Sequence, residues 1–480
     1  MPSPMFYVGS AMVAVIGIAA YLPRHKYIDK HYRNLQGYRR TFADVAYPGP
    51  GSSGRCTFSG AHNFTAVIRT KTLLEGIDVV PNFGMDKCQH VAGPSFCDDV
   101  RIQRSLNIGF LACDPSFPYR NYAASIFDES KIKEDGALWV YDLNKRGSPA
   151  EKLTIKGFKG PFHPSGVSFA PTSEDGTPAR VVVLVVNHVP NEIPRVEVLY
   201  YYPARKSLVY KKTISSEYFH AANKIAASGA ASHLNDDTPA FFVTNDHGYN
   251  LTNWKREYEE KYNLPASSVV FYHPRADRAQ EVGWRFQMPG AIVPANPPNS
   301  YWLALGKGGT LERYHSHMVS AEHQEQTVLS ADTREPITVS WPGMMMEETI
   351  HTAKVNVGMD YDAATKGFYT VSHPRWNDYL QHAKEKFEDK DGKPSVKAGF
   401  VISKGTEYTV QQGQVRPKPL KDVEFDPSEF PRRYRKKLFV EEVVSHDGSE
   451  FGAPSAIANT GDRVLVSSHY DHGFLDCDLS

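Results

Sequence analysis

Residues 181–188 read Val-Val-Val-Leu-Val-Val-Asn-His, a run of six apolar and mostly β-branched residues that ends on two polar ones. Such a run is typical of a buried β-strand. Two more apolar segments follow at residues 196–202 and 208–210, and residues 203–206 read as a turn between them. The three segments therefore predict an antiparallel meander.

The same pattern, an apolar strand with a polar end, recurs along the chain. Residues 240–247 read Ala-Phe-Phe-Val-Thr-Asn-Asp-His, and His247 follows His188 by 59 positions. Further members of the pattern are predicted at residues 108–114, 301–306, 368–373 and 464–469. Six such strands, each followed by one or two others, predict an all-β fold, a β-propeller of six blades. Two β-sandwiches in tandem are the alternative, but they would not explain the near-equal spacing.

The N-terminal region reads differently from the rest. Residues 5–22 carry no charge, and basic residues follow them without a small-residue cleavage site. This pattern favours an uncleaved signal anchor, so we expect a single-pass membrane helix and its basic flank in residues 1–40. Residues 41–60 read as a flexible linker and residues 61–480 as one propeller. Within it, apolar residues at helical spacing predict a helical insertion near residues 376–398.

Three features of the sequence bear on which side of the membrane the propeller lies, and they do not agree. The basic flank lies on the C-terminal side of the anchor, which by the positive-inside rule would leave the propeller in the cytoplasm. The sequons that begin at Asn63 and Asn250 favour glycosylation in the secretory lumen or outside the cell. The cysteines favour the same side, because a disulfide from Cys477 to Cys88 or Cys97 would join the two ends of the propeller into a ring. We therefore expect a lumenal or extracellular glycoprotein.

Composition and motifs exclude several functions. Lysine plus arginine and aspartate plus glutamate number 54 each, which gives no electrostatic reason to expect a nucleic-acid partner. The sequence has no Gly-x-Ser-x-Gly elbow and no Cys-x-x-Cys pair. The group His315, His317 and His323 is a weak candidate for a transition-metal site, and the basic cluster at residues 432–437 reads as a solvated loop or a contact with anionic lipid.

The polar ends of the repeated strands are the candidate site residues. If these strands are the innermost of their blades, their ends surround one mouth of the central channel. The group contains Asn187, His188, Asn245, Asp246, His247, His373, His469, Asp471 and His472, to which we add Asp98, Asp99, Asn223 and Asn356. Carboxylate and amide oxygens gathered on one axis are ligands that Ca²⁺ prefers, and histidine there could act as a general base for water.

The chain resembles the paraoxonase/arylesterase family. The most specific matches are Phe-His-Pro-Ser-Gly-Val-Ser at residues 162–168, Leu-Val-Val-Asn-His at 184–188, Thr-Asn-Asp-His at 244–247, and the ending from 472 to 479. The resemblance implies a six-bladed propeller with an uncleaved N-terminal helix, and a disulfide between Cys88 and Cys477. It also implies hydrolysis of lactones and aryl esters with the aid of a calcium ion in the channel.

The resemblance assigns a role to each metal position. Asp98 matches an acidic ligand of the catalytic calcium, and Asn223 and Asn356 match two ligand asparagines. Two further ligand positions hold residues that cannot replace the family's side chains, namely Val355 and either Met288 or Pro289. We therefore expect one calcium ion at most.

At the second, structural calcium of the family, Asp99 and the carbonyl of Val167 match, but Lys224 stands where an aspartate is expected. We expect the Lys224 ammonium to replace that ion by pairing with Asp99. His188 matches one member of the family's histidine dyad. Ser165 stands at the other position, and His163, two residues upstream, could substitute for the missing histidine.

Two function hypotheses follow. The first is a membrane-anchored hydrolase of lactones or aryl esters that uses metal-activated water, with His188, His163 and Ser165 as catalytic candidates. The second is a propeller that has lost this chemistry and serves as a binding or scaffold protein. A third possibility is a hydrolase with metal-independent chemistry in the same channel.

Overall fold

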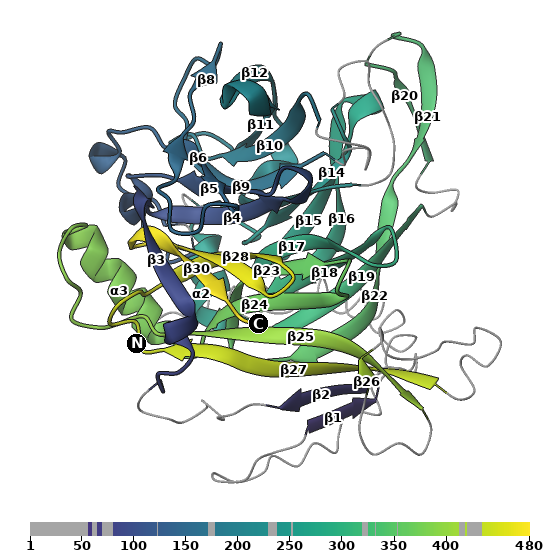
Figure 1. The fold of residues 1–480 in the computed structure, drawn as a ribbon. Helices are drawn as coiled ribbons and strands as arrows, with labels where there is room; N and C mark the ends of the chain where they lie inside the picture. The colour runs from purple at the N-terminus through teal and green to yellow at the C-terminus, as the bar shows by residue number, and fades with distance from the viewer. Residues whose placement is uncertain are drawn as a thin grey trace, which may run out of the picture.

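The computed structural model describes residues 56–59, 65–69, 80–121, 123–170, 178–228, 238–250, 253–318, 325–331, 333–352, 354–411, 418–419 and 434–480. Its strands form six blades around a central axis (Figure 1), so the predicted six-bladed β-propeller is confirmed. The predicted anchor helix in residues 5–22, most of the linker and the sequon residue Asn63 lie outside the described residues. Among the helices that are described, none has the length and hydropathy that a membrane span requires.

Each blade is built on an antiparallel sheet of four strands, and in blades 1 to 5 these strands follow in chain order from the innermost strand outward. Blade 1 contains β4 (Cys97–Gln103), β5 (Ile108–Cys113), β6 (Ala137–Asp142) and β7 (Glu151–Lys152). Blade 2 contains β9 (Pro164–Phe169), β10 (Val181–Asn187), β11 (Arg195–Tyr202) and β12 (Ser207–Ile214), with β8 (Ile155–Lys156) at its edge. Blade 3 contains β13 (Ala222–Ala227), β14 (Phe241–Asn245), β15 (Ser267–His273) and β16 (Arg278–Phe286).

Blade 4 contains β17 (Pro289–Ala295), β18 (Ser300–Leu305), β19 (Thr310–Met318) and β22 (Pro342–His351). The hairpin of β20 (Glu325–Leu329) and β21 (Pro336–Ser340) projects from this blade (Figure 1). Blade 5 contains β23 (Val355–Asp362), β24 (Gly367–His373), β25 (Phe400–Gln411) and β27 (Tyr434–His446), extended by β1 (Cys56–Ser59), β2 (Thr65–Arg69) and β26 (Lys418–Pro419). Blade 6 contains β28 (Pro454–Thr460), β29 (Arg463–Ser468), β30 (His472–Asp478) and, from the other end of the chain, β3 (Cys88–Ser95).

The apolar run at residues 181–186 lies in β10, and the alternation of its side chains explains why all six positions are apolar. Val182, Leu184 and Val186 pack into the cluster between blades 2 and 3, whereas residues 181, 183 and 185 pack into the cluster between blades 1 and 2. Both faces of the strand are therefore buried against a neighbouring blade, and the period-2 pattern of side chains gives a continuous apolar run.

These repeated apolar strands are the second strands of their blades. They form β5, β10, β14, β18, β24 and β29, so the premise that they are the innermost strands is wrong. A second strand is covered by adjacent blades on its two faces, whereas an innermost strand also faces the channel and accepts polar or small residues. Because the first and second strands are antiparallel, the end of each second strand still lies beside the beginning of the innermost strand.

Two disulfides join parts of the propeller. Cys88 and Cys477 are paired across β3 and β30, 389 residues apart in the sequence. This bond confirms the pairing implied by the family resemblance and closes the ring of blades. Cys97 and Cys113 form a second disulfide between β4 and β5, which the sequence left open.

In the described part of the chain, the two α-helices lie outside the blades. The short helix α2 (Lys255–Tyr262) follows β14. The helix α3 (Trp376–Glu388) follows β24 and confirms the helical spacing predicted for this stretch. Its Tyr379 and Ala383 pack with Phe96, Phe117 and other residues in a cluster at one end of the propeller. The insertion thus brings α3 close to the ends of the innermost strands.

Candidate functional site

Each of the six innermost strands begins with the same irregularity. Its pairing with the second strand slips near its first residues, so the innermost strand has one residue more than its partner. A bulge of this kind redirects a side chain out of the regular alternation. The residues at these bulges are Asp98, Ser165, Asn223, Gly290, Val357 and Ser455.

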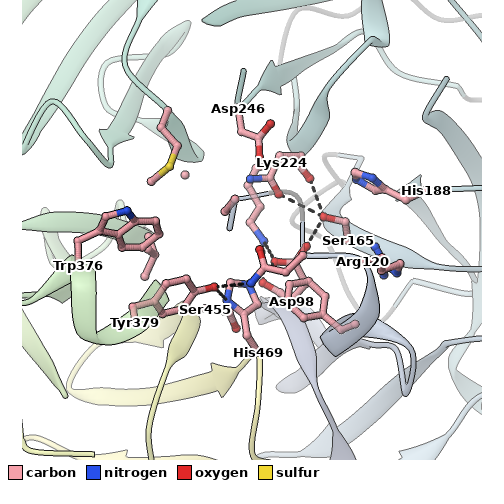
Figure 2. Close-up of a pocket in the computed structure, with 17 residues that line it drawn as sticks. Asp98, Arg120, Ser165, His188, Lys224, Asp246, Trp376, Tyr379, Ser455 and His469 are labelled. Carbon is pink, nitrogen blue, oxygen red and sulfur yellow. Dashed lines mark hydrogen bonds and ion pairs between the residues drawn. The ribbon is translucent and has the colours of Figure 1, made fainter. Parts of the chain in front are cut away.

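All six bulge residues line one cavity (Figure 2). The space between the lining atoms amounts to about 550 Å³, a volume that includes open solvent. Loops, β13 and α3 complete the wall with Phe117, Arg120, Asn121, Ala123, His188, Lys224, Asp246, Met288, Trp376, Tyr379 and His469. Charged and hydrogen-bonding groups therefore meet aromatic side chains in one buried space.

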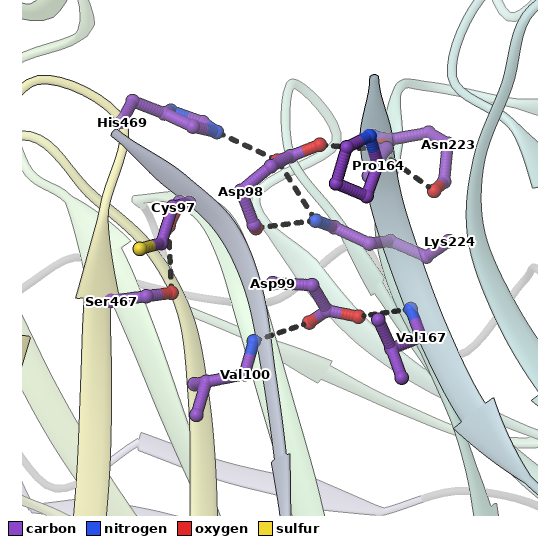
Figure 3. Close-up of polar contacts among 12 residues, drawn as sticks. Cys97, Asp98, Asp99, Val100, Pro164, Val167, Asn223, Lys224, Ser467 and His469 are labelled. Carbon is purple, nitrogen blue, oxygen red and sulfur yellow. Dashed lines mark hydrogen bonds and ion pairs between the residues drawn. The ribbon is translucent and has the colours of Figure 1, made fainter. Parts of the chain in front are cut away.

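Asp98 is the most heavily contacted polar residue of the cavity (Figure 3). Its Oδ1 lies 2.9 Å from Lys224 Nζ and 2.9 Å from His469 Nε2, and its Oδ2 accepts a hydrogen bond from the Ser165 hydroxyl. Burial would raise the pKa of Asp98, but Lys224, followed by His469 and Ser165, holds the pKa well below its usual value. Asp98 is therefore a carboxylate anion balanced by the Lys224 ammonium.

The predicted ion pair between Lys224 and Asp99 is wrong, because Lys224 pairs with Asp98. Its ammonium donates to the main-chain oxygen of Asp98 at 2.6 Å as well as to Oδ1 of that residue. The neighbouring Asp99 is engaged elsewhere, because its Oδ2 accepts from Val167 N at 2.9 Å and lies 3.4 Å from Arg101 Nε. The bulge at Asp98 separates the directions of the two carboxylates, so Lys224 on β13 meets Asp98, whereas Asp99 lies beside Arg101 of its own strand.

The residues that the family resemblance assigns to calcium do not fit that ion in this chain. An ammonium group lies against the Asp98 carboxylate, where a cation would be needed, and Arg101 occupies the corresponding place beside Asp99. Asn223 lines the cavity, and its Oδ1 lies 3.2 Å from the Ser165 hydroxyl. Asn356 is directed away, since its Nδ2 donates to Thr352 Oγ1 at 2.9 Å. Calcium needs six to eight oxygen ligands, and the described residues contain no cluster of three acidic, histidine or cysteine side chains that would hold a metal.

The three catalytic candidates from the sequence lie in different environments. His188 and Ser165 line the cavity, and burial, aided by Arg120, lowers the pKa of His188 to about 3. Its imidazole is therefore neutral at pH 7. His163 is turned toward Asp114, with Nδ1 3.0 Å from Oδ2 of that carboxylate. This contact directs the His163 ring to a residue outside the cavity lining, so the geometry does not support His163 as the second histidine.

A second histidine of the cavity is His469, at the end of β29. Its Nδ1 lies 2.7 Å from the Tyr379 hydroxyl, and its ring stacks on Phe117 with centroids 4.4 Å apart. Burial lowers the pKa of His469 despite the nearby Asp98. The sequence pattern predicted His469 as a polar strand end, but it did not predict Tyr379, Trp376 and Arg120 as residues of the cavity. The helical spacing of Tyr379 predicted only that it faces the protein interior.

The remaining strand ends mostly support the structure. Asn187 Oδ1 accepts from the main-chain N–H of His163 at 2.8 Å, and Asn245 Oδ1 accepts from that of Ala221 at 3.2 Å. Each asparagine thereby fastens the segment that precedes an innermost strand. His373 contacts two main-chain oxygens, Asp471 accepts from Gly452 N, and His472 contacts Ser95.

Asp246 and His247 connect the cavity wall to α2. Asp246 lines the cavity, and its Oδ1 lies 2.9 Å from His247 Nδ1. His247 Nε2 contacts Glu260 on α2, which in turn binds Lys307. Burial opposes protonation of His247, but Asp246 raises its pKa above the usual value. The group therefore forms an ion network behind the wall, and the nearby Asn250 is exposed.

The fold and the cavity define a class: a ring-closed, six-bladed β-propeller with a buried polar site at one end of its channel. Residues 128–304 match the family model described as Arylesterase. The serum paraoxonase/arylesterase 1 of Mus musculus is 36% identical over 169 residues, which is 35% of this chain and 42% of that protein. The serum paraoxonase/lactonase 3 of Homo sapiens is 33% identical over 144 residues, 30% of this chain and 37% of that protein. These matches confirm the resemblance to the paraoxonase/arylesterase family that the sequence predicted, over about a third of the chain.

The matches cover only part of the site. The chain spans about two fifths of the length of the curated relatives it matches, from 36% to 42%. Ser165, His188, Asn223 and Lys224 lie within residues 128–304, whereas Asp98, Tyr379 and His469 lie outside them. A regucalcin structure from Agrobacterium tumefaciens covers 81% of this chain and 95% of its own at 9% identity, but its TM-score of 0.36 is too low to support an assignment.

Proposed function

We propose that the protein hydrolyses carboxylic esters or lactones in this cavity, with the Lys224 ammonium in place of a metal ion as the group that polarises the substrate carbonyl. The observation that carries the proposal is the position of Lys224. Its side chain is only 2% exposed, lines the cavity and donates to two oxygens of Asp98. An ammonium has three N–H donors, so the third is available to a carbonyl oxygen.

Such a donor stabilises the charge that develops during ester hydrolysis. When water attacks the carbonyl carbon, negative charge moves to the carbonyl oxygen, and a fixed cation in a buried site lowers the energy of that state. The attacking water must lose a proton, and the cavity contains two histidines with lowered pKa values, His188 and His469. Either imidazole is neutral at pH 7 and can accept a proton. The names of the relatives, arylesterase and lactonase, agree with this class of substrate.

We further propose that residues 1–40 anchor the chain in a membrane and that the propeller lies in the secretory lumen or outside the cell. The two disulfides support that compartment, because such bonds persist in oxidising environments. A shift in mass after endoglycosidase treatment of the protein, abolished by Asn250→Gln together with Asn63→Gln, is the expected sign of this location. An unchanged mass would contradict the glycosylation.

The second candidate function is a binding or scaffold protein. The observation in its favour is that the Asp98 carboxylate is engaged by Lys224, His469 and Ser165. A cavity whose charges are balanced internally can hold a neutral small molecule without reacting with it. The two functions differ in turnover and not in binding.

The test is hydrolysis of a phenyl ester and of an aliphatic lactone by the full chain, with and without a chelator. We expect turnover that the chelator does not change and that Lys224→Met reduces at least ~100-fold, a loss typical of removing one charge-stabilising donor. Lys354→Met is the matched control, because it also breaks a buried pair, with Glu442, but away from the cavity lining. Absence of turnover with both substrates would overturn the hydrolase and favour the binding protein.

A further inference from the structure

We propose that Tyr379, His469 and Asp98 form a proton relay, in which the Tyr379 hydroxyl is the catalytic group that carries protons between His469 and the reacting oxygens of the substrate. This inference rests on the proposed hydrolysis and adds to it a catalytic residue supplied by α3. The three residues come from three different parts of the fold: Asp98 from blade 1, His469 from the end of β29 in blade 6, and Tyr379 from the helix inserted after β24 of blade 5.

The hydrogen bonds fix the direction of the relay. Asp98 Oδ1 lies 2.9 Å from His469 Nε2, and a carboxylate can only accept, so Nε2 carries the proton. In the neutral imidazole Nδ1 is then an acceptor, and the Tyr379 hydroxyl, 2.7 Å away, must donate to it. Asn121 Nδ2 donates to the Tyr379 oxygen at 2.9 Å. Because a tyrosine hydroxyl accepts as well as donates, the same oxygen can exchange a proton with a ligand in the cavity.

Packing holds the relay rigidly against the cavity. The His469 ring stacks on Phe117 at an interplanar angle of 8°, and the Tyr379 ring stacks on Trp376 with centroids 4.5 Å apart. Tyr379 is fully buried and His469 is 7% exposed, and both line the same cavity as Lys224. The hydroxyl that would exchange protons and the ammonium that would polarise the carbonyl therefore lie on the wall of one space (Figure 2).

The proton steps balance for ester or lactone hydrolysis. As water attacks the carbonyl carbon, its proton passes to the Tyr379 oxygen while the Tyr379 proton passes to His469 Nδ1. The resulting imidazolium is stabilised by the Asp98 carboxylate. When the bond between the carbonyl carbon and the leaving oxygen breaks, the proton returns through Tyr379 to that oxygen. The products are a carboxylic acid, which ionises in water, and an alcohol, so neither an oxidant nor a further reactant is needed.

The arrangement offers a matched pair of tyrosines for the test. Tyr470 is also buried, and its hydroxyl hydrogen-bonds to Asn121 Nδ2 and to the Tyr379 hydroxyl, but it is absent from the described cavity lining. Tyr379→Phe and Tyr470→Phe each remove one buried hydroxyl from the same asparagine. A structural role predicts similar losses for both, whereas a relay predicts a loss of turnover only for Tyr379→Phe.

The experiment measures kcat, KM and the solvent deuterium isotope effect of both variants, with thermal unfolding as the check on folding. We expect Tyr379→Phe to lower kcat about 100-fold with KM little changed, which is typical of losing proton transfer, and Tyr470→Phe to keep the wild-type kcat. If Tyr379→Phe does not fold, His469→Gln replaces it and should show the same loss. Where Tyr379→Phe and His469→Gln both fold, the variant that combines these two substitutions should have a kcat no lower than that of the slower single variant, because a relay acts as a unit.

Two outcomes overturn the proposal separately. Wild-type turnover that survives in Tyr379→Phe with an unchanged isotope effect would disprove the relay and leave the hydrolase proposal intact. A wild-type protein without turnover on either substrate would disprove the hydrolase, and with it the catalytic role of the relay.

Discussion

Lys224 Nζ lies 2.6 Å from the main-chain oxygen of Asp98 and 2.9 Å from its carboxylate Oδ1. One buried side chain thus neutralises the carboxylate and ties β13 of blade 3 to β4 of blade 1 across the channel. A protein that supplies its own cation at this place does not depend on a dissolved one.

Calcium should therefore have no effect on the stability of the wild-type propeller. We expect the same Tm with excess calcium and with a chelator. Lys224→Asp removes the ammonium and adds a carboxylate beside Asp98 and Asn223, so this variant should lose about 3–5 kcal/mol in chelator and regain part of it when calcium is added. Thermal unfolding of the two proteins in both conditions is the measurement. A wild-type Tm that falls in chelator would show that the chain holds the ion after all.

The disulfide between Cys88 and Cys477 should stabilise the whole ring. It closes a loop with a sequence separation of 389, against 16 for Cys97 and Cys113. Because the loss of chain entropy grows with loop length, we expect Cys88→Ser with Cys477→Ser to cost up to about 6 kcal/mol and the shorter pair about 3 kcal/mol. Denaturant unfolding of the two double variants checks the order. Equal losses would show that native contacts, and not loop closure, set the effect.

Much of the fold could be predicted because it repeats locally. The apolar second strands are continuous in sequence, and the burial of β10 on both faces produces its run of valines. A bond from Cys477 to the first part of the propeller also followed from the need to close the ring. The innermost strands gave a weaker signal, since channel-facing bulges such as those at Asp98 and Asn223 interrupt their alternation.

The site was predicted less well because its contacts are distant in sequence. Lys224 and Asp98 are 126 residues apart, and Tyr379 and His469 are 90 residues apart. A bulge decides that Lys224 meets Asp98 and not Asp99, and no residue pattern reveals that choice. The position of Tyr379 depends on how α3 docks against the propeller, and its helical spacing carries no information about which strand ends it will contact.

Low pH should weaken the contact between α2 and the cavity wall, because it protonates Glu260, which binds His247 and Lys307. Burial would raise the pKa of Glu260, but His247 and Lys307 lower it to about 2. Since this folded-state pKa lies below the ordinary value of 4.5, the stabilisation is complete above about pH 4.5 and is lost as the pH falls toward 2. Glu260→Gln should therefore destabilise the protein by about 1–2 kcal/mol at about pH 6, allowing for solvent screening. The gap between the two proteins should shrink at about pH 3, and a gap that stays constant in urea unfolding at both pH values would contradict this.

Gly166 sets the distance between β9 and β13, and with it the position of Lys224. A Cβ atom at Gly166 would lie 2.5 Å from the Asn223 oxygen and 2.8 Å from Lys224 Cα. Both are main-chain atoms, so the strand itself must move. Gly166→Ala should cost about 1–3 kcal/mol, as overpacking does, and should also displace the ammonium from Asp98.

Gly358→Ala separates these two effects. Its Cβ would lie 2.6 Å from Ala456 Cα, so it forces apart another pair of innermost strands, β23 and β28, without touching Lys224. We expect similar decreases in Tm for both variants, but roughly a tenfold or greater loss of ester or lactone turnover only for Gly166→Ala, because a carbonyl-polarising group acts only when it is correctly placed. Equal losses of turnover would mean that activity depends on the integrity of the ring as a whole, and the specific contribution of Lys224 would then have to be rejected.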